Sequence, residues 1–324
     1  MRVLVLEEAF ATPAERAYLP TPTPARLAMT ADTQGRLLHN VAAELLDLGD
    51  SRIAAMDKAG IDMQVLSLTA PGPQGYPAEA AIAIARDTND AAYEAVKRHP
   101  DRFAAFCAVP TSDVAAAVKE LDRCVKLGFV GTLINGHTNG EFMDHRKYWP
   151  LFECAEALDV PIYIHPTMPP AAVMKSCFEG FEELARAPWG FSFETGLHFL
   201  RLVFAGVFDA FPRLKIILGH NGEGIPFVLD RIDLHCRVSV KRKGLKRSTS
   251  EYVREHMIVT TSGNFSVPAF KCTAEVMGLD NVLFSIDWPF ESNEDGMDFL
   301  HKLPLNDTDM HKVAHGNAER VLKL

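Results

Sequence analysis

The sequence lacks the features that mark membrane proteins and disulfide-rich secreted proteins. None of its apolar runs reaches the roughly 18 residues that a membrane-spanning helix needs. No cleavable signal pattern precedes the strand-like run at 2–6. The six cysteines are scattered and form no CxxC pair, which indicates buried thiols rather than disulfides. We therefore expect a cytoplasmic protein with no membrane partner.

Basic charge is also scarce, with 33 Lys and Arg against 42 Asp and Glu and a net charge of −9. A protein that binds a phosphate backbone needs a basic patch, and the short cluster at 241–247 is better explained as a solvated helix end. We expect no nucleic-acid partner. No GxGxxG follows the first apolar run, where Glu7 and Glu8 stand instead, which disfavours a dinucleotide-binding sheet.

The sequence does contain eight short apolar or β-branched runs. They lie at 2–6, 62–68, 103–109, 128–134, 161–165, 214–219, 257–262 and 281–286. Most are too continuous for half-exposed antiparallel strands and are typical of a parallel sheet buried on both faces. Helical periodicity fills segments between them, at 77–99, 112–126, 146–158, 195–210, 223–236, 266–278 and 308–322.

This alternation predicts one (β/α)8 TIM barrel over residues 1–324, since no change of composition marks a linker. A doubly wound open sheet is the alternative. Three segments do not fit the repeat and are interpreted as loop insertions: 12–36, 167–190 and 238–250. Each follows a strand, so we expect them to cover the carboxyl-terminal face, where such barrels build their active sites.

Four residues at the ends of these runs can bind a metal: Glu7, His165, His220 and Asp287. Only barrel closure brings the first, fifth, sixth and eighth runs together. Each residue also has a structural explanation: Glu7 can form a salt bridge, His165 a core hydrogen bond, His220 a glycine turn and Asp287 an N-cap. Together they predict one divalent ion on carboxylate and imidazole ligands, which suits Zn²⁺ or Mn²⁺, with Mg²⁺ possible.

Glu223 lies three residues beyond His220, so a carboxylate stands beside an imidazole. Such a pair fixes the ring tautomer and lets the imidazole move a proton. Arg231 follows two turns later on the same expected helix, where it can clamp an anionic substrate or form a surface salt bridge. His198 stands among apolar neighbours and is predicted to be structural.

Five segments together resemble a known family. They are LEEAFATP at 6–13, DVPIYIHP at 159–166, LKIILGHNGEG at 214–224, IVTTSGNF at 258–265 and LFSIDWPFE at 283–291. The chain resembles, over essentially its whole length, the decarboxylase branch of the amidohydrolase superfamily, whose closest members act on dihydroxybenzoates and salicylate. The resemblance implies that Glu7, His165 and Asp287 hold the metal, with His220 and Glu223 beside the substrate. Ala9 stands where other members carry a histidine, which implies a more open metal site and argues against binuclear hydrolases.

The reaction implied by the resemblance is a non-oxidative decarboxylation without an organic cofactor. The substrate carboxylate and ortho-hydroxyl would chelate the metal, and the ring carbon would be protonated before CO₂ leaves. Asp287 is the first candidate for the acid. Because a metal-bound carboxylate is a poor proton donor, His220 with Glu223 is the second.

Several alternatives stay open at this point. Phe290 and Trp288 can contact an aromatic ring or simply pack. A metal-dependent hydrolase of a lactone or amide, with Asp287 as base, fits the same barrel, and a non-catalytic binding protein is a third possibility. We expect a small aromatic carboxylate as the substrate and a homodimer or homotetramer as the assembly.

Overall fold

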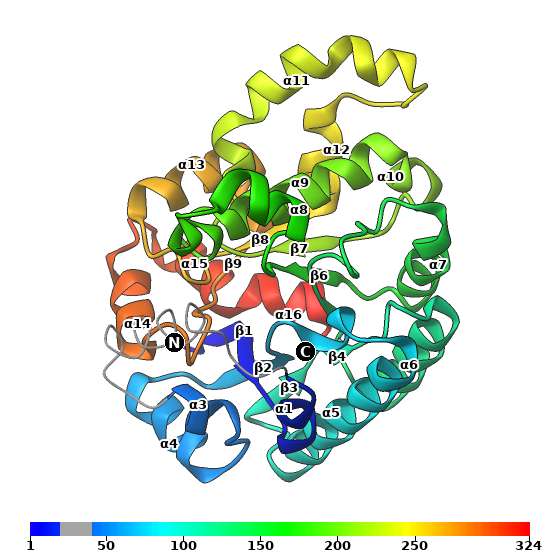
Figure 1. Cartoon of the computed structure of the whole chain (residues 1–324). Helices are drawn as coiled ribbons and strands as arrows, with labels where there is room; N and C mark the ends of the chain where they lie inside the picture. Colours follow the sequence, from blue (N-terminus) through cyan, green and yellow to red (C-terminus); the bar gives the residue numbers. More distant parts are fainter. Residues whose placement is uncertain (20–40) are drawn as a thin grey trace.

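The computed structural model describes residues 1–19 and 41–324, and all of its paired strands run parallel (Figure 1). The strands are β1 (Leu4–Phe10), β2 (Met63–Leu68), β3 (Phe103–Ala105), β4 (Cys107–Ala108), β5 (Thr132–Asn135), β6 (Ile162–His165), β7 (Ile216–Leu218), β8 (Met257–Thr260) and β9 (Val282–Leu283). Each of the eight apolar runs overlaps at least one of them, so the parallel strands predicted from the sequence are confirmed.

The third run is divided into β3 and β4 at Phe106. The Phe106 amide donates to the Leu66 carbonyl at 2.9 Å, whereas the next amide, of Cys107, donates to the Gly131 carbonyl at 2.9 Å. The pairing therefore passes from β2 on one side to β5 on the other within one barrel strand. Two hydrogen-bonded groups result, β1-β2-β3 and β4-β5-β6-β7-β8-β9.

The first and last strands are joined by individual contacts rather than by a regular ladder. The Ala9 amide donates to the Trp288 carbonyl at 2.7 Å, and the Ser285 hydroxyl bonds the Leu6 carbonyl. These bonds close the ring, and the predicted (β/α)8 barrel is confirmed.

Helices occupy the connections between the strands (Figure 1). They are α1 (Pro13–Tyr18), α3 (Val41–Leu45), α4 (Asp50–Ala59), α5 (Ala78–Arg98), α6 (Val114–Lys126), α7 (Trp149–Leu158), α8 (Ala171–Val173), α9 (Gly190–Ala205), α10 (Val207–Ala210), α11 (Ile225–Arg242), α12 (Thr249–His256), α13 (Val267–Met277), α14 (Asn293–Lys302), α15 (Asp307–His311) and α16 (Asn317–Leu322). Short 3₁₀ or π turns complete them: η1 (Gly72–Gly75), η2 (Arg146–Tyr148), η3 (Met174–Phe178), η4 (Glu182–Ala185), η5 (Leu279–Asn281) and η6 (Lys312–Gly316). No helix in the described ranges is both long and apolar enough to cross a membrane.

The three predicted insertions have different outcomes. Part of the segment 12–36 lies outside the described residues, and its start forms α1. Segment 167–190 is a series of short turns, α8, η3 and η4, as expected for an insertion. Segment 238–250 is corrected, because α11 continues unbroken to Arg242 instead of ending near residue 236.

Apolar side chains fill the inside of the barrel below its carboxyl-terminal face. The interior cluster takes alternate residues of the strands, which is the two-residue period of a strand with one face turned inward. Its strand members include Leu4, Leu6, Met63, Val65, Ala104, Leu133, Tyr163, Ile217, Ile258 and Leu283, and α16 adds Ala318 and Leu322. Polar residues follow two positions further along some of these strands, such as His165 after Tyr163 and Thr260 after Ile258, and they lie at the site.

Candidate metal and acid–base site

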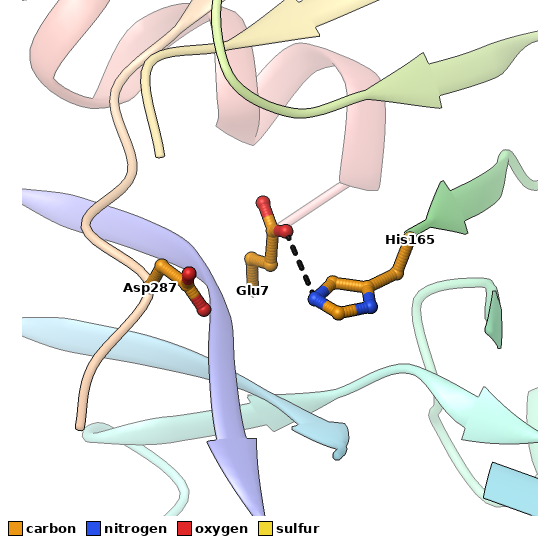
Figure 2. A group of neighbouring side chains, drawn as sticks. All are labelled: Glu7, His165 and Asp287. Carbon is orange, nitrogen blue, oxygen red and sulfur yellow. Dashed lines mark ion pairs between the residues drawn. The ribbon is translucent and has the colours of Figure 1, made fainter. Parts of the chain in front are cut away.

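Three of the residues predicted at the strand ends converge: Glu7 of β1, His165 of β6 and Asp287 in the segment after β9. Each offers a ligand atom, and these atoms all lie within 4.8 Å of one another. Glu7 Oε1 is 3.4 Å from His165 Nε2, the contact drawn in Figure 2. The structure thus brings together the metal-ligand set that the sequence predicted.

These donors fit a divalent cation. Glu7 Oε1 and Asp287 Oδ1 are buried without a hydrogen-bond partner among the described residues. Buried carboxylate oxygens without partners are costly, and a cation between them removes that cost. Two carboxylates and one imidazole, with no thiolate, suit a borderline divalent ion and leave coordination positions open for a ligand.

A chain of hydroxyl groups supports Glu7 from below. The Tyr163 hydroxyl donates to Glu7 Oε2 and lies 2.8 Å from Thr260 Oγ1, which in turn lies 2.9 Å from Ser262 Oγ. Burial and the charge of Glu7 raise the pKa of Tyr163 well above its usual value, so the phenol stays protonated and donates. Tyr163 was not predicted from the sequence, although strand alternation puts it on the same inward face as His165.

Backbone in the left-handed region is concentrated at this site. The φ angles are 66° at Glu7, 55° at His220, 56° at Glu223 and 81° at Asp287. Non-glycine residues in this region cost roughly 1–3 kcal/mol each and persist only where surrounding contacts hold them. At Glu7 the angle accompanies a break in register between Val5 and Glu8 of β1. Glu7 therefore lies within β1 at an irregularity, which corrects the expectation that the strand ends before it.

His220 and Glu223 form the predicted pair beside the ligand cluster. His220 Nδ1 is 2.7 Å from Glu223 Oε1, and His220 Nε2 is 3.9 Å from Glu7 Oε1. Burial by itself lowers the pKa of His220, but the charges of Glu223 and Glu7 outweigh it and raise that pKa to about 10. The pair therefore holds a proton next to the site.

Asp287 is the second group at the site that can carry a proton. Burial, followed by the charge of Glu7, raises the pKa of its carboxyl well above the usual range. A Cβ added at Gly263 would lie 3.0 Å from His220 Cδ2 and 3.6 Å from Asp287 Oδ2. The imidazole and the carboxyl therefore both flank Gly263, which places two candidate acids at one point.

Two residues were predicted to bind substrate: Arg231 on α11, and Phe290, whose amide donates to the Asp287 carbonyl at 2.9 Å. Arg231 is exposed on α11, and its role as a carboxylate clamp stays a prediction. Phe290 is half-buried against Ala9, Ala11, Val41 and Leu45.

Two other residues singled out in the sequence have packing roles. Trp288 is buried, with the Arg52 guanidinium 4.3 Å from its ring centroid, which agrees with the packing alternative for that residue. His198 is fully buried, and its Nε2 accepts the Met143 amide at 3.1 Å, as expected of a structural histidine.

Two buried glutamates near the site were not predicted. Glu8 carries a carboxyl group whose oxygens accept the backbone amides of Ile286 and Trp288, and burial raises its pKa to about 8. Glu194 of α9 lies near the strand ends, because a Cβ added at Gly136 would come within 3.0 Å of its Oε1. Burial raises the pKa of Glu194 to about 8.

Comparison with known proteins agrees with this geometry. The family model described as amidohydrolase matches residues 23–324. The chain belongs to the amidohydrolase family. A γ-resorcylate decarboxylase of Rhizobium radiobacter is 42% identical over 291 residues, covering 86% of this chain and 88% of that protein. One from Polaromonas sp. is 40% identical over 293 residues, covering 87% and 89%.

Solved structures of amidohydrolase-family decarboxylases superpose on the whole chain. A 2,6-dihydroxybenzoate decarboxylase complexed with 2,6-dihydroxybenzoate has a TM-score of 0.88, 39% identity and full coverage of both chains. A dihydroxybenzoic acid decarboxylase from Polaromonas sp., with bound manganese and 2-nitroresorcinol, has a TM-score of 0.89, 36% identity and coverage of 100% and 97%. The resemblance to the decarboxylase branch, stated from the sequence motifs, is confirmed.

Proposed function

We propose that this chain is a metal-dependent, non-oxidative decarboxylase of an ortho-hydroxybenzoate of the 2,6-dihydroxybenzoate type. The observation that carries the proposal is the convergence of Glu7, His165 and Asp287 beside the His220–Glu223 pair. Relatives about 40% identical over most of the chain are named for this activity, which makes the enzyme a carbon–carbon lyase.

Glu7, His165 and Asp287 would hold one divalent ion. When bound, the ion supplies a Lewis acid and a template for an oxygen-bearing substrate. Manganese is the first choice because a similar structure binds it, and zinc or magnesium are the other outcomes of an elemental analysis. The proposal needs no organic cofactor.

The protein's own part in the reaction is to deliver a proton to a ring carbon. Asp287 donates it to the carbon that bears the carboxylate, the electrons of the C–CO₂ bond then return to the ring, and CO₂ leaves. His220, held by Glu223, stands beside Asp287 and either restores its proton or donates in its place. Burial of these groups keeps bulk water from competing for the proton.

A panel of aromatic acids tests the proposal. Purified protein loaded with Mn²⁺ is expected to consume 2,6-dihydroxybenzoate, seen as loss of ultraviolet absorbance with equimolar CO₂ release. Benzoate and the dimethyl ether of the substrate, which has no free ortho-hydroxyl, are the controls and are expected not to turn over. No turnover of any ortho-hydroxybenzoate, together with hydrolysis of a lactone or amide, would replace the proposal by the hydrolase alternative.

We also propose that two copies of the chain associate through α11. This helix lies at the outer edge of the molecule (Figure 1). Its residues Phe227, Leu234 and Val238 are 82%, 56% and 76% exposed. Spaced seven and four residues apart, they form one apolar stripe that also contains Arg231. Such a stripe is expensive to leave in water and is suited to a second copy of itself.

The charges of α11 favour an antiparallel arrangement of the two copies. Its first half, 225–233, carries two aspartates and exposed Arg231, a net charge of −1. Its second half, 234–242, carries three exposed basic residues: Arg237, Lys241 and Arg242. A two-fold axis near the helix centre sets the acidic half of one copy against the basic half of the other. Analytical ultracentrifugation is expected to show a dimer that the double variant Phe227→Glu/Val238→Glu converts to monomer. The control Ile82→Glu, at an exposed apolar position of α5, should stay dimeric; a monomeric wild-type chain overturns the proposal.

A further inference from the structure

Glu8 lies next to the metal-ligand cluster but faces the seam between β1 and the segment after β9. Its side chain is fully buried. Oε1 accepts the Ile286 amide at 3.2 Å, and Oε2 accepts the Trp288 amide at 3.0 Å. One carboxylate thus holds the backbone on both sides of Asp287.

The segment that Glu8 holds has a conformation that needs support. Asp287 has a φ of 81°, which an aspartate rarely adopts without external contacts. A carboxyl group that accepts two nearby backbone amides restrains the backbone between them. The Trp288 amide lies in the peptide plane after Asp287, and the Ile286 amide lies in the plane before Ile286. Binding both therefore restrains the backbone rotations of Ile286 and Asp287 between them, and with these the direction of the Asp287 side chain.

Residue 288 is also fastened from other sides. Its carbonyl accepts the Ala9 amide at 2.7 Å, and its ring packs under the Arg52 guanidinium. Arg52 Nη2 in turn donates to the Ala9 carbonyl at 2.7 Å. These contacts hold Trp288 against β1, but none of them involves the Ile286 amide. Among the described residues, Glu8 alone has side-chain hydrogen bonds to both flanking amides.

From this geometry we infer that Glu8 is a positioning residue for Asp287: its carboxylate keeps residues 286–288 in the conformation that points the Asp287 carboxyl at Glu7 and His165. The inference rests on the proposed function for its kinetic consequence, since Asp287 is there the proton donor. Its consequence for metal affinity needs only the ligand cluster. Because Glu7 and Glu8 are adjacent on β1, one strand supplies a ligand and also orients the ligand opposite to it.

The test is Glu8→Gln, which is isosteric but turns one acceptor into a donor facing a backbone amide. We expect kcat to fall about 100- to 1,000-fold with KM changed less than about threefold, because the acid is misdirected while the binding surface remains. Mn²⁺ affinity, measured by calorimetry without substrate, should fall about 10- to 100-fold, as is common when a group that orients a metal ligand is removed.

Thr261→Val is the matched control. Its hydroxyl is fully buried and also bonds backbone of the last strand, donating to the Ser285 carbonyl and accepting the Ser285 amide, both at 3.0 Å, but it does not touch the amides beside Asp287. This variant is expected to lower the melting temperature while leaving kcat and Mn²⁺ affinity within about threefold of wild type. Equal losses of both quantities in the two variants, at equal loss of melting temperature, would show that Glu8 only closes the barrel.

Glu8→Asp keeps the test open if Glu8→Gln does not fold. It retains a carboxyl group, but one methylene less prevents that group from reaching both amides, so the same kinetic and metal-binding losses are expected. Wild-type kcat and Mn²⁺ affinity in this variant overturn the inference. A wild-type enzyme that decarboxylates nothing overturns the proposed function instead, and the calorimetric comparison still decides the role of Glu8.

Discussion

At the scale of single residues, His165 is the imidazole whose loss should matter most. It is the histidine in the ligand cluster, with Nε2 facing Glu7. His165→Ala should weaken Mn²⁺ binding at least about 100-fold and abolish decarboxylation, because two carboxylates alone hold the ion poorly. Calorimetry and elemental analysis check this, with exposed His301→Ala as control. A His165→Ala protein that keeps its ion and its rate would mean that another histidine binds the metal.

Substitutions can rank how much the two candidate acids, Asp287 and the His220–Glu223 pair, contribute to kcat. Asp287→Asn should lower kcat about 1,000- to 10,000-fold, since an amide cannot deliver a proton. Glu223→Gln should lower it only about 10- to 100-fold if Glu223 merely orients His220. Steady-state kinetics on both variants, with folding checked by circular dichroism, give the ranking. The opposite order assigns the acid role to the His220–Glu223 pair.

His198 makes the fold sensitive to acid. Burial, helped by the nearby charges of His137 and Arg201, lowers its pKa to about 3. The unfolded chain binds this proton near pH 6.5 and the folded chain only near pH 3, so stability is full above pH 6.5 and falls as the pH drops. The free energy of unfolding should decline by up to about 1.4 kcal/mol per pH unit more in wild type than in His198→Gln. Urea denaturation at several pH values from 6.5 to 4.5 measures this free energy. The same decline with pH in both proteins would refute the prediction.

At the scale of elements, strand ends could be predicted and their irregularities could not. Aligning apolar runs correctly placed His165, His220 and Asp287, because continuous hydrophobic stretches end where a barrel strand meets its active-site face. No feature of the sequence indicates the break in register within β1, between Val5 and Glu8. Alternation alone cannot tell whether Glu7 or Glu8 faces inward once one residue adopts a left-handed backbone, and for this reason Glu8 was missed.

At Gly219, directly after β7, the neighbouring side chains leave no space for a Cβ atom. A Cβ at Gly219 would lie 2.8 Å from Ser262 Oγ and 2.9 Å from Glu7 Oε2. Gly219→Ala should therefore push Glu7 away from Tyr163 and weaken Mn²⁺ binding about 10-fold or more, with little loss of melting temperature. Calorimetry measures it against Gly75→Ala, where the nearest atom would be 3.6 Å away. Equal Mn²⁺ affinity in both variants would contradict the packing described.

Helix α11 shows why substrate residues were harder to predict than metal ligands. Periodicity correctly indicated a helix after Glu223, but it does not say whether the face that carries Arg231 meets the barrel or solvent. That face is exposed, together with Phe227 and Leu234. Phe290 was similarly ambiguous, because an aromatic residue past a strand end can pack as readily as it can bind.

At the scale of the whole molecule, the barrel followed from the alternation of buried strands and helices. Right-handed crossovers leave few other ways to arrange eight parallel strands. The splitting of the third strand at Phe106 does not alter that order. A single domain over residues 1–324 and a cytoplasmic location stay predictions from the sequence.

The fate of one proton tests the central claim most directly. The proposed reaction replaces the bond between the ring carbon and CO₂ by a bond to a solvent-derived proton, whereas a hydrolase places no proton on carbon. 2,6-Dihydroxybenzoate turned over in D₂O must therefore give resorcinol with one deuterium on the carbon that held the carboxylate. Mass spectrometry and NMR locate the label, and resorcinol incubated with the enzyme in D₂O without bicarbonate controls for exchange. A product formed in D₂O without ring deuterium at that carbon would contradict the mechanism.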